Sequence, residues 1–443
     1  MSDFPCDGDD TPNPFGDFSE GLNQMFQMFG AGGLGGLGGL GTTNWEQARA
    51  AAAAMATEGT PDSNVDPLVR MQYEQLARVA ELQITQLTGL PMTRSGAPLV
   101  ISAVNRSQFA RMSVDDLQPL FEKLADSLGR MMTAQMNQLT GDDLAEMSEL
   151  LPPGLSIDLP SIMAQASKMI GPMMLVTLAG STAGQLASRA FGSYDLPIPR
   201  PRDHELLIVA TSLDRFGEEW SLPLDDLRLY LCLSEMATHA VLSIPHVAER
   251  INGLLAQYAD GFEADPEAIG RQFEDVDLSD PSAMQSLQES MMRPDFMLNA
   301  IRSPRQRELL PHIDALVSCV IGYVDWVVDS ISSTMLGTPE MISEAFRRRR
   351  VETDEASRFV ERLFGLELTR EKCDLGSAFI DGVVERAGAD ALATLWESVD
   401  NLPTPNELEL PGLWLARVGL GSDQSLPELD EPFDIPDFPD LDA

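Results

Sequence analysis

Apolar residues recur at helical spacing along most of the chain, most clearly from Leu309 to Ile331, where they predict one helix over residues 305–336. A long apolar helix is also expected after the acidic start at Leu224, and Pro245 should end or kink it. The same spacing predicts further helices over residues 44–54, 66–88, 114–138 (with Ser113 as its N-terminal cap), 142–150, 161–191, 341–350, 355–364, 376–386 and 389–399.

One segment instead has the pattern of a strand. Glu205-Leu-Leu-Ile-Val-Ala-Thr211 is a short apolar run, and the prolines at positions 197 and 199 exclude a helix just before it. The expected fold is therefore mainly α with a small β element. Four regions are predicted: a disordered acidic and Gly-rich segment (1–42), a helical lobe (43–191), a second lobe (192–420) and a disordered acidic tail (421–443).

Charge narrows the range of partners. The 443 residues include 69 Asp and Glu against 30 Lys and Arg, which gives a formal net charge of −39. This field repels phosphate backbones and anionic lipid, so no nucleic-acid partner is expected. Residues 433–441 alternate apolar with acidic or proline residues, a pattern typical of short docking segments.

Cysteine use and apolar stretches indicate a cytoplasmic protein. Cys232 and Cys319 lie in apolar runs, no CxxC pair occurs, and buried thiols of a cytosolic protein are expected. No basic region followed by an apolar stretch opens the chain as a secretory signal would. The apolar segment 169–186 is broken by Pro172 and polar residues, so no membrane span is expected.

Few patterns in the sequence carry chemistry. No Gly-x-Ser-x-Gly motif occurs, and the run Arg347 to Arg350 is interpreted as a charged helix face. A metallopeptidase helix places two histidines four residues apart with a Glu after the first. The segment Leu231-Cys-Leu-Ser-Glu-Met-Ala-Thr-His239 alone predicts a buried amphipathic helix with one acidic residue, Glu235.

Short sequence blocks in a fixed order carry a resemblance. They are Asn44-Trp-Glu-Gln-Ala-Arg49, Gly192-Ser-Tyr-Asp-Leu-Pro-Ile-Pro199, Leu224-Asp-Asp-Leu-Arg228, Ile244-Pro-His-Val-Ala-Glu-Arg250, Gly322-Tyr-Val-Asp325, Ala345-Phe-Arg-Arg-Arg-Arg350 and Phe364-Gly-Leu-Glu-Leu368. Together they resemble the actinobacterial zincin-like metallopeptidase family, whose members are described as hydrolases or as associated with deazaflavin-cofactor biosynthesis. The resemblance covers residues 43–420 and implies a zincin-like architecture whose second lobe carries the metal-site helix.

The resemblance also implies what has changed at the metal site. It places Ser234 and Thr238 where the family has its two zinc-binding histidines, and Glu235 where it has the catalytic base. Ile321, just before Gly322, stands where a third ligand, a Glu, is expected. Hydroxyl and aliphatic side chains are poor substitutes for imidazole and carboxylate toward Zn²⁺. No metal or other cofactor is therefore predicted, although zinc is implied for the wider family.

The sequence thus favours a pseudoenzyme, a metallopeptidase-like protein that binds an unknown protein or peptide through its inherited cleft. One alternative is an active metal-dependent hydrolase with a non-standard site, for instance one formed by Glu235 and His239, which lie four residues apart. Another is a structural or assembly protein that acts through its acidic tails. Glu235 is either a vestigial base beside Ser234 and Thr238 or a structural residue that bonds an arginine or a backbone group.

Overall fold

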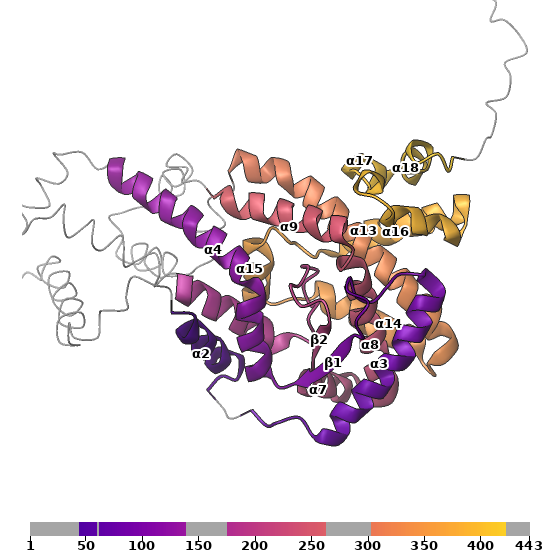
Figure 1. Ribbon diagram of the computed structural model, residues 1–443, viewed down its shortest axis with the longest axis horizontal. Coiled ribbons are helices and arrows are strands. Elements are labelled where there is room, and N and C mark those ends of the chain that lie inside the picture. The colour runs from indigo at the N-terminus through magenta and orange to yellow at the C-terminus, as the bar shows by residue number, and fades with distance from the viewer. Residues whose placement is uncertain (1–43, 60–61, 139–174, 263–302, 422–443) are drawn as a thin grey trace, which may run out of the picture.

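The computed structural model describes residues 44–59, 62–138, 175–262 and 303–421 (Figure 1). The predictions for residues 1–42 and for the helix over 142–150 lie outside the described residues. So do the first part of the helix expected over 161–191 and nearly all of the acidic tail.

The described part of the chain is mainly helical with a small sheet, which confirms the predicted fold class. Residues 175–189 are helical as well. The other helices are α2 (Trp45–Ala56), α3 (Pro67–Thr88), α4 (Arg106–Gln138), α7 (Ala210–Trp220), α8 (Leu224–Leu242), α9 (Pro245–Asp260), α13 (Pro304–Met335), α14 (Pro339–Val351), α15 (Glu355–Leu363), α16 (Arg370–Ala387), α17 (Pro405–Glu409) and α18 (Pro411–Arg417), with 3₁₀ segments at Ala389–Trp396 and Val399–Asn401.

Two parallel strands form the sheet of the described residues: β1 (Val100–Val104) and β2 (Glu205–Val209), with Val100 opposite Glu205. The strand expected over residues 205–211 is confirmed but shorter, because α7 already begins at Ala210. The other edge of β2 is covered by the segment around Gly192, where the N–H of Ser193 donates to the carbonyl oxygen of Leu207 (3.0 Å). Strand β1 has no counterpart among the sequence predictions.

Helix α13 packs against α8, α9 and α16. It confirms the helix predicted over residues 305–336. The contact with α16 is close, because a Cβ atom at Gly376 would lie 2.0 Å from the carbonyl oxygen of Ser318. Among the described helices, α13 alone has the length and apolarity of a membrane span, and 83% of its apolar window is buried. Such burial is typical of the core helix of a water-soluble fold, so this is weak evidence for a span.

Several helices differ from their predicted bounds. Helix α16 begins at Arg370 and not at residue 376, and the segment predicted as a helix over 389–399 forms 3₁₀ turns instead. Helix α4 begins at Arg106, so Ser113 lies inside it, 2% exposed, and does not cap it. Asn105 and Gln108 bond each other's backbone N–H groups at the true start, a capping box that the sequence analysis did not identify. Of the two outcomes predicted at Pro245, the helix ends instead of kinking: α8 ends at Leu242, and Pro245 begins α9.

Candidate functional site

The three predicted metal-ligand positions line one small cavity. Ser234 and Thr238 lie one turn apart on α8, and Ile321 faces them from α13. The cavity has a volume of about 40 Å³. Its full lining is Tyr194, Asp195, Pro197, Ser234, Thr238, Val320, Ile321, Val324, Arg350 and Leu368. A water molecule needs roughly 10–15 Å³ of such volume, so the cavity has room for a few waters and not for a peptide segment.

The side chains at these three positions offer little to a metal ion. The hydroxyl of Thr238 donates to the carbonyl oxygen of Ser234 on the same helix (2.8 Å). Ser234 is partly exposed and contributes one hydroxyl, while Ile321 has no donor atom. Within the described residues, no group of three or more His, Cys, Asp or Glu side chains is placed to hold a metal ion.

Glu235 does not line this cavity. Its Oε2 accepts a hydrogen bond from the backbone N–H of Tyr194 (2.9 Å), and the residue is only 5% exposed. A Cβ atom at Gly192 would lie 2.4 Å from the carboxyl carbon, so only glycine leaves room for the carboxyl group there. Two roles were considered for Glu235, a vestigial base and a structural residue. The contact with the backbone of Tyr194 is of the structural kind.

Burial determines the charge state of Glu235. Desolvation raises the pKa of its carboxyl group from 4.5 to about 8, with a further upward contribution from the charge of Asp195. The hydrogen bond from Tyr194 and the charges of Arg200 and Arg349 lower it by less. Glu235 is therefore largely protonated and neutral near pH 7.

His239 is buried and fully hydrogen-bonded. It is 1% exposed, and its Nδ1 lies 2.8 Å from the hydroxyl of Tyr194 while its Nε2 lies 3.1 Å from the carbonyl oxygen of Asp203. Because a carbonyl oxygen only accepts, we assign the ring proton to Nε2, so that Nδ1 accepts from Tyr194. Burial lowers the pKa of the imidazole and keeps it neutral. Both nitrogens are occupied, so this geometry does not form the shifted metal site with Glu235.

Ion pairs surround the cavity. Asp195 pairs with Arg349 (2.9 Å) and with Arg189 (3.4 Å). Arg350 binds both carboxylate oxygens of Asp325 at 2.9 Å each. Burial alone would raise the pKa of Asp195, but the two arginines hold it below its usual value. These pairs tie the loop at Asp195 and helix α13 to α14.

The interpretation of Arg347 to Arg350 as a charged helix face is wrong for its last two members. The side chains of Arg349 and Arg350 are 18% and 20% exposed and are held in the ion pairs just described. Sequence reasoning did not assign Asp195 or Asp325 to the site. Both lie within blocks that carried the resemblance, and that is the one signal in the sequence that pointed to them.

Comparison with known proteins places this arrangement in a family. The family described as zincin-like metallopeptidase matches residues 43–415. The chain belongs to this family. A crystal structure from Chloroflexus aurantiacus, of a protein provisionally called a hydrolase with a novel fold, has a TM-score of 0.54 and 23% sequence identity. The match covers 85% of this chain and 99% of the Chloroflexus chain. At 23% identity this likeness shows the fold alone. A search of curated protein sequences gave no match.

Membership of the family raises the question of whether zinc fits here. Zinc in proteins is held by imidazole, thiolate and carboxylate groups, and catalytic sites supply three of them. At the three ligand positions this zincin-like chain presents two hydroxyls, one of them already bonded within α8, and an isoleucine. The one carboxylate in the cavity lining, that of Asp195, is already paired with Arg349 and Arg189. The donor set does not fit zinc.

Proposed function

We propose that this zincin-like protein holds no catalytic zinc, does not hydrolyse peptide bonds, and acts by binding a protein or peptide. The observation that carries the proposal is the cavity shared by Ser234, Thr238 and Ile321. The family's ligand positions, as the resemblance assigns them, converge there, but none of the three side chains is one that zinc favours.

The state of Glu235 also supports the loss of catalysis. A general base must be ionised and within hydrogen-bond reach of the proton that it removes. Glu235 is largely neutral near pH 7, and its carboxyl group bonds the backbone of Tyr194 instead of lining the cavity. The chain's own residues thus offer no activated water at this position.

A partner that entered through the inherited cleft would meet a closed structure. The cavity is too small for a peptide segment, and the Arg350–Asp325 pair joins α14 to α13 beside it. Opening this region would separate Arg350 from the largely buried Asp325 and break both of their hydrogen bonds, which is unfavourable. We therefore expect the partner to bind at a surface that is already open.

Metal analysis of the purified full-length chain tests the loss of zinc. The wild-type protein, dialysed against zinc and then against buffer, should retain far less than one equivalent. A ligand-restored variant, Ser234→His, Thr238→His and Ile321→Glu, should bind about one equivalent, because its three new side chains converge on the same cavity. The melting temperature of this variant should rise when zinc is added, since the metal binds only the folded state.

The matched control is the variant Ser234→Asn, Thr238→Asn and Ile321→Gln. It fills the cavity to a similar extent but supplies no imidazole or carboxylate, so neither zinc content nor a zinc-dependent melting shift should appear. Stoichiometric zinc in the wild-type protein would refute the proposed loss of metal. A folded restored variant that binds no zinc would show that the ligand positions are wrongly assigned.

A further inference from the structure

Helix α3 exposes more large apolar side chains than any other helix of the described residues. Of fourteen such exposed side chains, five lie on α3: Leu68, Met71, Val79, Leu82 and Leu87. Leu68 and Leu82 are 68% and 64% exposed. The helix lies at the surface, and its other face packs against α8 (Figure 1). Contiguous exposed apolar patches mark interaction sites, so this face is a candidate for one.

Four of these residues form one stripe together with a glutamine. At about 100° per residue, positions 68, 71, 75, 79 and 82 fall within an arc of about 80°. We call them the α3 stripe: Leu68, Met71, Gln75, Val79 and Leu82. The buried residues of α3 lie on the opposite side of the helix and are Tyr73, Ala77, Ala80 and Ile84. Helix α3 is therefore apolar on two faces, and the described residues cover only one of them.

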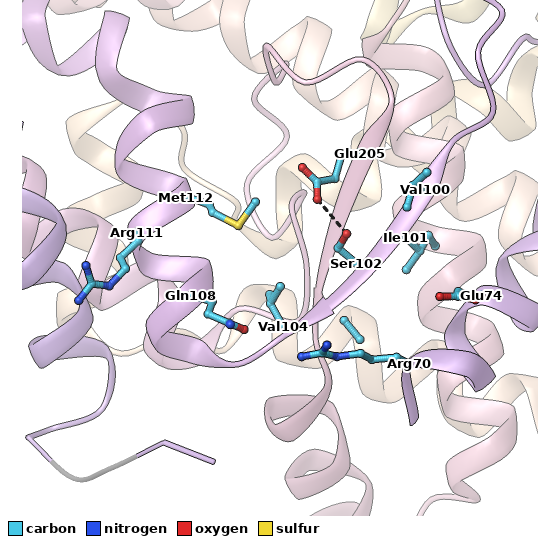
Figure 2. Close-up of a pocket in the computed structure, with 11 residues that line it drawn as sticks. Arg70, Glu74, Val100, Ile101, Ser102, Val104, Gln108, Arg111, Met112 and Glu205 are labelled. Atoms are coloured by element: carbon cyan, nitrogen blue, oxygen red, sulfur yellow. Dashed lines mark hydrogen bonds between the residues drawn. The ribbon is translucent and has the colours of Figure 1, made fainter. Parts of the chain in front are cut away.

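A cavity beside α3 does not include the stripe. It lies between α3, β1 and α4 and has a volume of about 450 Å³. Of α3 it is lined by Arg70 and Glu74 (Figure 2). These two residues lie about 100–140° round the helix from Gln75, the middle of the stripe. The stripe is therefore an outer surface of the helix and not a wall of this cavity.

The spacing of the stripe is symmetric about Gln75. Leu68 and Leu82 lie seven residues to either side of it, and Met71 and Val79 lie four. A second copy of α3, antiparallel and with Gln75 on the twofold axis, would place Leu68 against Leu82 of the partner subunit. It would also place Met71 against Val79 of the partner subunit. The amide of Gln75 has donors and an acceptor, so it can pair with its own copy across the axis.

Charge also favours a copy of the same helix. The chain has a formal net charge of −39, but α3 carries two arginines and two glutamates, so its own net charge is zero. The stripe contains no charged residue. In an antiparallel pair the same flank of both helices meets, and Arg78 then lies within about 3 Å, along the helix axis, of Glu74 of the partner subunit. Two copies that meet along α3 thus bring opposite charges together beside the stripe.

We propose that the α3 stripe is the interface of a homodimer, in which two copies of α3 pack antiparallel about a twofold axis at Gln75. The stripe is about 21 Å long from Leu68 to Leu82. A single helix pair of this length covers less than the roughly 1,200–2,000 Å² of a standard interface, so a weak and reversible dimer in the micromolar range is expected. The stripe shares no residue with the cavity of Ser234 and Thr238, so dimerisation does not depend on the proposed loss of zinc.

Sedimentation velocity of the full chain, from about 1 to about 100 μM in about 0.15 M salt, measures this dimer. The wild type should shift reversibly from monomer to dimer over this range. Met71→Glu and Val79→Lys each place a charge against an apolar residue of the second copy, so each variant alone should dimerise at least about tenfold more weakly. Both positions are exposed in the monomer, so the melting temperatures of the variants should stay close to that of the wild type.

Mixing the two variants tests the antiparallel arrangement. In a mixed dimer the introduced acid lies opposite the introduced base, and the other contact keeps a Met against a Val. The mixture should therefore dimerise at least about tenfold more tightly than either variant alone. A parallel pair would place position 71 against position 71 and would give no such rescue. Met341→Glu is the matched control, because it adds an acid at an exposed methionine of α14, and it should dimerise as the wild type does.

Three results would overturn the proposal. One is a wild type that stays monomeric up to about 100 μM, as would follow if another segment of the chain or a different protein were the occupant. Another is a dimer that Met71→Glu and Val79→Lys leave unchanged, which would place the interface on another surface. The last is a mixture of the two variants that dimerises no better than each alone, which would exclude the antiparallel pair.

Discussion

Replacing Glu235 by Gln should make the protein less sensitive to alkaline pH. Glutamine keeps the shape of the side chain and an oxygen that accepts from the N–H of Tyr194, but it cannot ionise. The pKa of Glu235 is raised in the folded state from 4.5 to about 8. Between these pH values the folded protein retains a proton that the unfolded chain has lost, so the free energy of unfolding of the wild type falls as pH rises.

The size of the effect follows from the two pKa values. At about 1.4 kcal/mol per pKa unit, the difference between 4.5 and 8 corresponds to roughly 5 kcal/mol of stability lost by pH 9. Burial also raises the pKa of Glu361, to about 7. Glu361 is present in both proteins, so its contribution to the pH dependence cancels when the two free energies of unfolding are subtracted. The stability of Glu235→Gln relative to wild type should therefore rise by several kcal/mol between pH 5 and pH 9 and change little below pH 5.

Urea unfolding followed by circular dichroism, at one-unit steps from pH 5 to pH 9, measures this difference. Glu344→Gln, at an exposed position of α14, gives the baseline for removing one negative charge. If the difference between Glu235→Gln and wild type stays within about 1 kcal/mol of that baseline over the whole range, the carboxyl group is ionised in the folded state. The structural reasoning on Glu235 would then be wrong.

Three other experiments test the packing. Gly376→Ala should lower the free energy of unfolding in urea by about 3 kcal/mol or more, because its Cβ would lie 2.0 Å from the backbone of α13. Gly412→Ala is the control and should be near neutral, because the space around Gly412 is open. Tyr194→Phe leaves a nitrogen of the buried histidine without its donor and should cost about 1–3 kcal/mol in the same assay. The thiols of Cys232 and Cys319 are buried with raised pKa values, so both should react with a thiol reagent only after unfolding, as mass spectrometry would show.

The helical framework was largely predictable because most of its information is local. Helix α13 has an apolar residue at every turn and begins at Pro304, so its period and its start appear in the sequence. Strand β1 was not predictable in this way. Its five residues lie just before a long helix, and only pairing with β2, about 100 positions away in the sequence, makes them a strand. The start of α4 depends partly on Asp62, whose carboxylate accepts from the backbone of Arg106.

The site was predictable only in part, and for a different reason. Family resemblance, not periodicity, singled out Ser234, Thr238 and Ile321, and the structure brings these three to one cavity. The ion pairs around it were missed because charge runs are usually solvated. Nothing local distinguishes Arg349, which is paired and lies 3.5 Å from the centre of the Phe191 ring, from the exposed Arg348.

The presence of Glu235 on α8 has a structural explanation that needs no catalysis. Its neutral carboxyl group occupies the space above Gly192 and bonds the N–H of Tyr194, joining α8 to the segment that borders β2. Alanine would leave that buried N–H without a partner, at a cost of about 1–3 kcal/mol, and would open a cavity as well. Packing therefore favours a side chain of this length at position 235, whether or not the site carries out chemistry. The Glu at this position is evidence about the fold of this region rather than about its activity.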